Sequence, residues 1–279
     1  MIATQDLEKI FSLAIASGYV KGEKPVSLMI VSERPESGKT EVVNKFIGTK
    51  NLAYLSDVTA YALWRDFHEQ IARGELKHLI IPEFLAPISR HSQTVQSFIA
   101  TLQMLIEEGI MEIHTGFQNP IKLIAPTTVG AIVCLPRDAF SRNRCDWEIS
   151  GFLSRFMVVS YRYNGATVKR IFDSIAEREY LGTSKTPLDL PNTEQEVDIP
   201  TDIAKAARDY AIGITRQARV DGKSYGFREF KNMLRMIAAN VVLEGNGRRE
   251  VTMKDFGEIV RLSYLLNEEF NELHEVSNA

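Results

Sequence analysis

The sequence predicts an α/β fold, in which a parallel β-sheet flanked by helices is followed by a small, entirely helical region. Up to about residue 180, short apolar runs of strand length alternate with segments of helical periodicity. Residues 183–201 are rich in Pro, Thr, Asp and Glu, as expected of a linker, and only helical periodicity follows them. We therefore expect an α/β domain over residues 1–182, a linker over 183–201 and a helical domain over 202–279.

The elements of the α/β domain follow one another in a simple order. An amphipathic helix opens the chain, with an apolar stripe of Leu7, Ile10, Phe11 and Ala14. Buried strands are expected at the apolar runs 26–32, 51–56, 78–85 and 127–136. Helical stripes follow the first three runs, and the longest covers residues 95–106. Alternating patterns over 110–115 and 121–125 then predict a β-hairpin around the sequence GFQNP.

Three apolar stripes predict the helices of the C-terminal domain, over residues 203–214, 230–241 and 252–262. Thr252 and Asp255 have the spacing of a capping box, so we expect the last helix to begin there.

The composition is that of an ordinary soluble protein, with 25% charged residues and a formal net charge of −3. This balance gives no overall sign of affinity for nucleic acid or membranes. Cys134 and Cys145 lack metal-ligand spacing and are expected to be reduced. The N-terminus lacks the pattern of a signal peptide, and no apolar run reaches the roughly 18 residues that span a bilayer. We therefore expect a cytoplasmic protein without membrane contact.

The turn after the first strand carries the clearest chemical signal. The sequence SERPESGKT places Gly-Lys-Thr between a buried strand and an amphipathic helix, which is the setting of a phosphate-binding loop. Its lysine would meet the β- and γ-phosphates of ATP, and its threonine would bind Mg²⁺. The expected nucleotide-binding residues are Glu36, Ser37, Gly38, Lys39, Thr40 and Glu41. The first glycine of the usual pattern is missing, because Glu33 occupies that position. An accidental lysine in a turn is the alternative.

A second signal is Glu83 in the sequence LIIPEF. P-loop ATPases commonly end this strand in Asp-Glu, in which the aspartate orders the Mg²⁺ shell and the glutamate activates water. Pro82 replaces the aspartate, so metal binding would depend on Thr40 and the phosphates. The alternative is an exposed glutamate at the end of a strand.

These segments together resemble an AAA+ ATPase of the clade that carries a β-hairpin before sensor 1, which includes MCM helicases, magnesium chelatase and MoxR proteins. The resemblance runs from Val26 to about Leu266. SGKT resembles a degenerate Walker A and LIIPEF a degenerate Walker B. The hairpin precedes a strand that resembles sensor 1, GFLSRFMVVSY resembles the arginine-finger segment, and the final helices resemble the sensor-2 lid.

The resemblance implies roles for two arginines. Arg155 would be an arginine finger that reaches the ATP of a neighbouring subunit, and Arg228 would be the sensor-2 arginine. It therefore implies a homo-oligomer, either a ring such as a hexamer or an open spiral. For both Arg155 and Arg228, the alternative is an arginine held in a surface salt bridge. Cys134, Leu135 and Pro136 occupy the end of the sensor-1 strand, where the family has an asparagine.

Two functional hypotheses follow. The first is an ATPase that acts on DNA in replication or in a mobile element, with Glu83, Arg155 and Arg228 as catalytic residues. The second is a nucleotide-gated assembly factor that hydrolyses little ATP and recruits a protein partner, which the missing aspartate favours. A P-loop kinase is a third reading, without support from a phosphoacceptor site. For the first hypothesis, Phe117 at the hairpin tip is a candidate contact to a base, with a peptide contact or a purely structural hairpin as the alternatives. The arginines 137, 142 and 144, expected on a loop, are candidate contacts to the phosphate backbone, with a solvated surface or a subunit contact as the alternatives.

Overall fold

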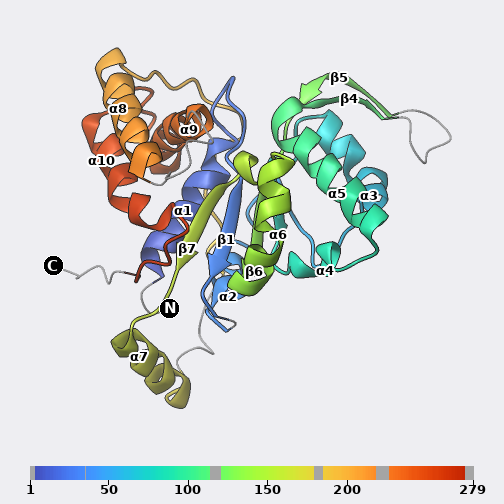
Figure 1. Cartoon of the computed structure of the whole chain (residues 1–279). Coiled ribbons are helices and arrows are strands. Elements are labelled where there is room, and N and C mark those ends of the chain that lie inside the picture. Colours follow the sequence, from blue (N-terminus) through green and yellow to red (C-terminus); the bar gives the residue numbers. More distant parts are fainter. Residues whose placement is uncertain (1–3, 35, 114–120, 179–184, 218–225, 274–279) are drawn as a thin grey trace.

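The computed structural model describes residues 4–34, 36–113, 121–178, 185–217 and 226–273. A parallel sheet lies at the centre, helices cover both of its faces, and the C-terminal helices form an additional layer on one side (Figure 1). The predicted α/β architecture with a helical C-terminal region is confirmed at this level.

The central sheet has five parallel strands in the order β2-β3-β6-β1-β7. Their bounds are β1 Leu28–Ser32, β2 Leu52–Tyr54, β3 His78–Ile81, β6 Gly130–Pro136 and β7 Met157–Tyr161. Strand β1 pairs with β6 on one side and β7 on the other, so it lies inside the sheet and is buried along its whole length. This burial on both faces explains why the run 26–32 is continuously apolar rather than alternating.

Successive residues of the strands point into two separate cores. On one face, Leu28 and Ile30 of β1 pack with α1 (Gln5–Ser17) and α2 (Lys39–Asn44). On the other face, Met29 and Val31 pack with α3 (Ala60–Ala72) and α5 (Ser92–Gln103). The period of two along each strand thus divides the apolar residues between the two layers of helices.

The predicted hairpin is present as the antiparallel pair β4 (Ile110–Ile113) and β5 (Ile121–Thr127). A π-helical turn, Met104–Glu108, connects it to α5, and Gly109 then takes a positive φ of 76°. The hairpin tip, with the candidate contact residue Phe117, lies outside the described residues.

Two expectations about local structure are wrong. The arginines 137, 142 and 144 lie on the helix α6 (Arg137–Ile149), not on a loop, because the apolar side chains of Ala139, Phe140 and Trp147 anchor one face of that segment against the sheet. The strand at 78–85 ends at Ile81, since Pro82 begins a turn that leads into the short helix α4 (Leu85–Ile88). Glu83 therefore lies in a loop rather than on the strand.

The C-terminal helices are α8 (Thr201–Gln217), α9 (Phe227–Glu244) and α10 (Met253–Leu262), and a 3₁₀ turn, Ser263–Leu265, directly follows α10. A second 3₁₀ turn, Leu153–Arg155, precedes β7. Helix α9 packs against α1, so the helical region and one layer of the sheet share a single hydrophobic core. The predicted capping box of Thr252 and Asp255 is confirmed at the start of α10.

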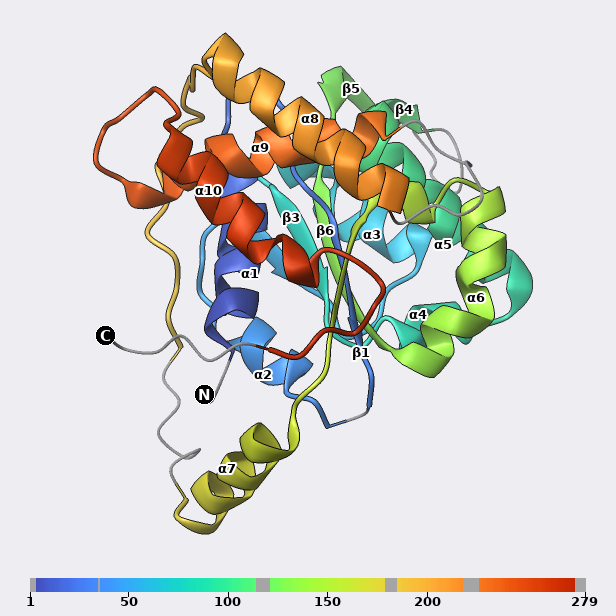
Figure 2. The ribbon, with the colours of Figure 1, turned by 60° about the vertical axis from the view of Figure 1, so that its left-hand side comes forward.

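Helix α7 (Gly165–Ala176) was not expected from the sequence, and it projects away from the body of the molecule (Figure 2). Asn164 caps its first turn by accepting a hydrogen bond from the amide of Thr167 at 2.8 Å. Among the described helices, none has both the length and the apolar character needed to cross a membrane.

Candidate functional site

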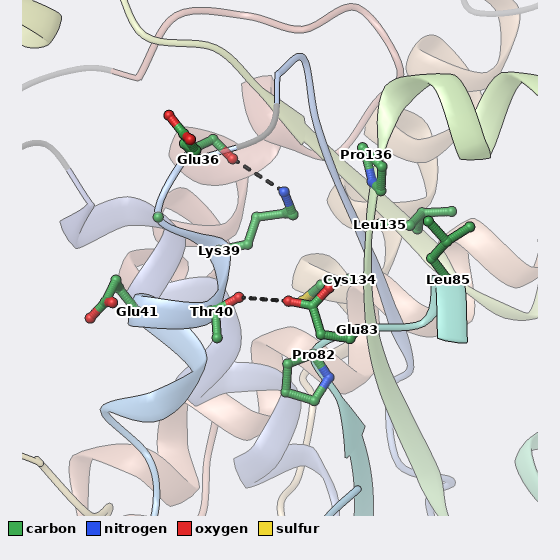
Figure 3. A pocket seen from close by; sticks show the side chains of 12 residues that line it. Glu36, Lys39, Thr40, Glu41, Pro82, Glu83, Leu85, Cys134, Leu135 and Pro136 are labelled. Carbon is green, nitrogen blue, oxygen red and sulfur yellow. Dashed lines mark hydrogen bonds between the residues drawn. The ribbon is translucent and has the colours of Figure 1, made fainter. Parts of the chain in front are cut away.

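A cavity of about 420 Å³ lies at the carboxyl ends of three neighbouring strands, β1, β6 and β3 (Figure 3). The loop after β1 leads to α2 on one face of the sheet, while β6 leads to α6 on the other face. In open parallel sheets, such a point of divergence is where ligands bind. The lining residues include all six predicted loop residues as well as Glu83: Glu36, Ser37, Gly38, Lys39, Thr40, Glu41, Pro82, Glu83, Leu85, Cys134, Leu135 and Pro136.

The loop between β1 and α2 has an unusual backbone at two positions. Glu36 has a φ of 61° and Gly38 a φ of 74°, both in the left-handed region. A Cβ atom on Gly38 would also lie only 3.2 Å from the Tyr163 hydroxyl, so the backbone conformation and the close neighbour both favour glycine there. This confirms a structural requirement for the glycine of Gly-Lys-Thr, although the first glycine of the pattern is absent.

Lys39 is only partly exposed and turns its ammonium group toward the end of β1. Its Nζ donates a hydrogen bond to Ser32 Oγ at 2.6 Å and a longer one to Ser37 Oγ at 3.3 Å. Burial lowers the pKa of Lys39, while the nearby Cys134 and Glu83 act in the opposite direction. A partly desolvated cation at the strand end interacts more strongly with an anion than a lysine in bulk water does.

Thr40 and Glu83 come together across the cavity. The Thr40 hydroxyl donates a hydrogen bond to Glu83 Oε1 at 3.3 Å, which Figure 3 shows as a dashed line. The two residues come from different connections, one after β1 and the other after β3. Pro82 lines the cavity beside Glu83 and offers no ligand atom in its side chain.

The end of β6 contributes apolar and sulfur atoms to the site. Cys134 is buried next to Lys39 and Glu83, and burial raises the pKa of its thiol to about 12. The thiol is therefore protonated at neutral pH and is a weak hydrogen-bond donor at most. Both cysteines are free, as expected from the sequence.

The three arginines of α6 already have partners in this chain. Arg137 stacks 4.9 Å from the centre of the Phe270 ring and lies 3.9 Å from Glu33. Arg144 pairs with Glu148 and Glu268 at 3.0 Å each. Arg142 donates a hydrogen bond to the Asp138 carbonyl of its own helix.

Arg155 and Arg228 lie close to each other at the opposite edge of the sheet from the cavity. Arg155 precedes β7, whose Met157 is in register with Leu28 at the start of β1, so it is a strand length, roughly 15 Å, from the loop after Ser32. Its guanidinium contacts Glu108 at 2.7 Å and the Gly151 carbonyl at 2.6 Å. Arg228 donates a hydrogen bond to Ser154 Oγ at 2.5 Å. The structure thus brings these arginines together with each other but not with the cavity of the same chain.

Three residues of the site were missed by sequence reasoning. Ser32 holds Lys39, while the hydroxyls of Tyr161 and Tyr163 donate to the Ser37 carbonyl at 2.9 and 2.7 Å. The tyrosines reach the loop because β7 pairs directly with β1, which places Tyr161 opposite Ser32. No local pattern around residues 161–163 indicates that pairing.

Comparison of the sequence with protein-family models and with curated proteins finds no match. Within the described residues, no group of three or more His, Cys, Asp or Glu side chains is arranged to hold a metal ion.

Proposed function

We propose that this chain binds a nucleoside triphosphate in the cavity at the ends of β1, β6 and β3, and that it hydrolyses this nucleotide as a subunit of an oligomer. The observation that carries the proposal is the convergence of Lys39, Thr40 and Glu83, since a cation, a hydroxyl and a carboxylate lie at one cavity. Its volume of about 420 Å³ lies within the usual range of small-ligand sites.

The residues suit a triphosphate with Mg²⁺. Lys39 would attract the β- and γ-phosphates, and Thr40 Oγ1 would serve as a metal ligand. When bound, the magnesium ion neutralises charge that develops on the phosphates. Glu83 would orient the attacking water and accept its proton, because its carboxylate lies beside Thr40 and is exposed to solvent. ATP is named because of the resemblance to AAA+ proteins and not because of a contact to the nucleotide base.

The proposal of an oligomer rests on the roles that the resemblance implies for the two arginines and on where they lie. Arg155 and Arg228 are at the sheet edge away from the cavity, so any action of either on phosphate requires the cavity of another copy. Such a contact between copies matches the arginine-finger role that the resemblance implies for Arg155. We therefore include a ring or spiral assembly in the proposal.

A second function, a nucleotide-gated assembly factor with little hydrolysis, is favoured by one observation. Pro82 stands beside Glu83 where an acidic metal ligand would be needed, and its side chain offers no ligand atom to the cavity. A loosely held metal would permit binding but slow turnover. Action on DNA is proposed from the resemblance alone. Stimulation of ATP turnover by DNA would distinguish a DNA-acting ATPase from the assembly factor.

The test is to measure ATP binding by calorimetry and phosphate release in parallel, with and without single- and double-stranded DNA. Lys39→Ala is the test variant. Lys50→Ala is the matched control, because Lys50 is an exposed lysine near α2 that contacts Asn192. Binding that is lost in Lys39→Ala and kept in Lys50→Ala supports the site. Turnover that rises with DNA supports a DNA-acting ATPase, binding without turnover supports the switch, and a wild-type protein that does not bind ATP refutes the proposal.

A further inference from the structure

The carbonyl oxygen of Ser37 accepts two tyrosine hydrogen bonds. Tyr163 Oη donates at 2.7 Å and Tyr161 Oη at 2.9 Å, with a longer contact from Tyr161 to Ser37 Oγ at 3.4 Å. The two rings meet edge to face with centroids 5.9 Å apart, so each holds the other in place. Tyr161, the last residue of β7, and Tyr163, two residues beyond it, thus bind one backbone atom of the loop between β1 and α2.

These contacts fix the direction of the following amide. In a planar trans peptide, the carbonyl of one residue and the N–H of the next point in opposite directions. The Ser37 carbonyl faces the β7 side of β1, where the tyrosines lie. The Gly38 N–H therefore faces the β6 and β3 side, and Gly38, Lys39 and Glu83 all line the cavity there.

We infer that Tyr161 and Tyr163 are positioning residues for phosphate: they hold the Ser37–Gly38 peptide with its N–H directed into the cavity as an anion donor. The inference rests on the proposed function and names residues that set its affinity for the phosphate chain. The loop lacks the first glycine of its pattern and carries Glu33 instead. The hydroxyls of Tyr161 and Tyr163 constrain this loop by their hydrogen bonds to the Ser37 carbonyl.

The chemistry of the two hydroxyls suits this role. Burial raises the pKa of Tyr163 to about 12, and burial likewise raises the pKa of Tyr161 well above its usual value. Both therefore remain neutral donors throughout the physiological range. A Phe at either position keeps the ring and removes one of the two donors, and Phe at both positions leaves the Ser37 carbonyl without a tyrosine partner.

The experiment uses the few serine–glycine pairs in the chain as reporters. Labelling serine with ¹³C at the carbonyl and glycine with ¹⁵N selects the amides that follow serine, which are those of Gly18, Gly38 and Gly151. Gly18 and Gly151 lie away from the cavity and act as internal references. The probe is inorganic tripolyphosphate with Mg²⁺, with ATP titrated in parallel, against wild type, Tyr163→Phe and the double Tyr161→Phe/Tyr163→Phe variant.

We expect tripolyphosphate to shift the Gly38 amide of the wild type and to leave Gly18 and Gly151 unchanged. The double variant should bind both ligands about tenfold more weakly, and its Gly38 resonance should be displaced before any ligand is added. Tyr210→Phe is the control, because Tyr210 also makes a hydroxyl hydrogen bond, to Ser263 at 2.5 Å, but lies in the helical region. It should bind as the wild type does.

The outcomes separate this inference from the proposed function. A wild type that binds neither ligand refutes the nucleotide site itself. A wild type that binds ATP while its Gly38 amide stays unchanged, or variants that bind as tightly as wild type, would overturn the role of the tyrosines and leave the site standing. Thermal unfolding of each variant is measured alongside. If the double variant does not fold, the single Tyr163→Phe variant decides, since Tyr163 is the less buried of the two.

Discussion

The Thr40 hydroxyl lies 3.3 Å from a carboxylate oxygen of Glu83, although 43 residues separate them in the sequence. The parallel order of the sheet creates this proximity, because β1 and β3 both direct their carboxyl ends to the same edge with β6 between them. In the proposed function, Thr40 as a metal ligand and Glu83 as a general base would then act on the same phosphate group.

Replacement of Glu83 by Gln should separate binding from chemistry. The amide keeps the size of the side chain but cannot accept a proton, so phosphate release should fall by about a hundredfold or more. ATP affinity, measured by calorimetry, should stay within about twofold of wild type. Glu75→Gln is the control, because Glu75 is exposed and is not among the residues that line the cavity. Equal losses in both variants would show that overall charge, rather than Glu83, matters.

Arg155 provides a test of assembly. Arg155→Ala should lower turnover by about a thousandfold without changing ATP affinity, because an arginine finger acts on a neighbour's transition state. Mixing Arg155→Ala with Lys39→Ala should then restore part of the activity, since some interfaces combine an intact cavity with an intact arginine. Arg73→Ala, at an exposed arginine paired with Glu69, should have no effect. An inactive mixture, or an active Arg155→Ala protein, would contradict the role between subunits.

The sequence predicts the loop of the site much better than its surroundings. Gly38, Lys39 and Thr40 form a contiguous pattern between a strand and a helix, and a local pattern of this kind is visible without the fold. Ser32, Tyr161 and Tyr163 join the site only through the pairing of β1 with β7, which is a long-range contact. Pairings of distant strands are not encoded in local periodicity, so these residues could not be found from the sequence.

The errors in secondary structure concern two helices whose patterns are local. Helix α6 has many polar and charged side chains, and its apolar anchors are few, so its periodicity is weak. Helix α7 is amphipathic, but Val168, Phe172 and Ile175 of its apolar face are exposed in this chain. The capping box at Thr252, in contrast, needs only neighbouring residues and was predicted correctly.

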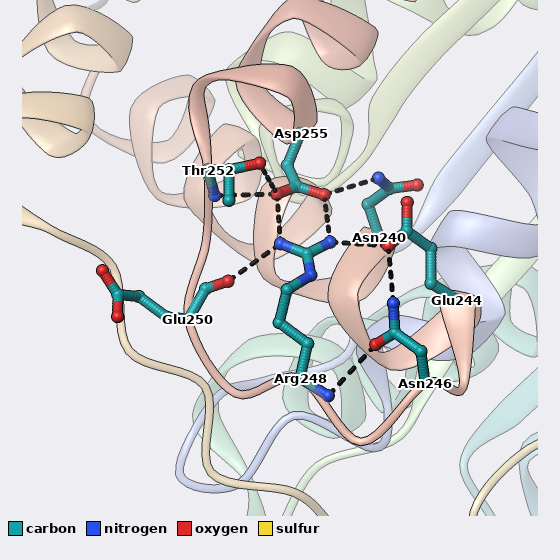
Figure 4. Close-up of polar contacts among 7 residues, drawn as sticks. All are labelled: Asn240, Glu244, Asn246, Arg248, Glu250, Thr252 and Asp255. Carbon is teal, nitrogen blue, oxygen red and sulfur yellow. Dashed lines mark hydrogen bonds and ion pairs between the residues drawn. The ribbon is translucent and has the colours of Figure 1, made fainter.

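The polar cluster around Arg248 should stabilise the turn between α9 and α10 (Figure 4). Arg248 makes two hydrogen bonds to Asp255, at 2.6 and 2.9 Å, and Asp255 is fully buried. Burial alone raises the pKa of Asp255, but the hydrogen bonds from Arg248, Thr252 and Asn240 outweigh it and lower the pKa.

Removing the partner of a buried carboxylate is costly, so Arg248→Ala should lower the free energy of unfolding by about 3 kcal/mol. Arg208→Ala is the matched control, because Arg208 pairs with exposed Asp209 and should cost less than about 1 kcal/mol. Urea denaturation followed by circular dichroism measures both. Similar losses in the two variants would show that the buried geometry of the cluster adds nothing.

His78 should make stability depend on pH. Its ring is fully buried between Gly18 and Gly130, Nε2 lies 3.1 Å from the Val26 carbonyl, and Nδ1 has no partner among the described residues. Burial lowers the pKa of this imidazole from 6.5 to about 4. The unfolded chain therefore takes up a proton at a higher pH than the folded chain does. The contribution of neutral His78 to the free energy of unfolding is full above pH 6.5 and declines as the pH falls toward 4. Below pH 4, this histidine causes no further change.

Between pH 7.5 and 5.5 the free energy of unfolding should fall by about 1 kcal/mol from His78 alone. Urea titrations at both pH values measure the change. His78→Gln should remove it by eliminating the titrating group, whereas His91→Gln, at an exposed histidine, should leave it intact. If the pH dependence is the same in wild type and His78→Gln, His78 does not titrate differently in the folded and unfolded chains, and its burial has no thermodynamic consequence in this range.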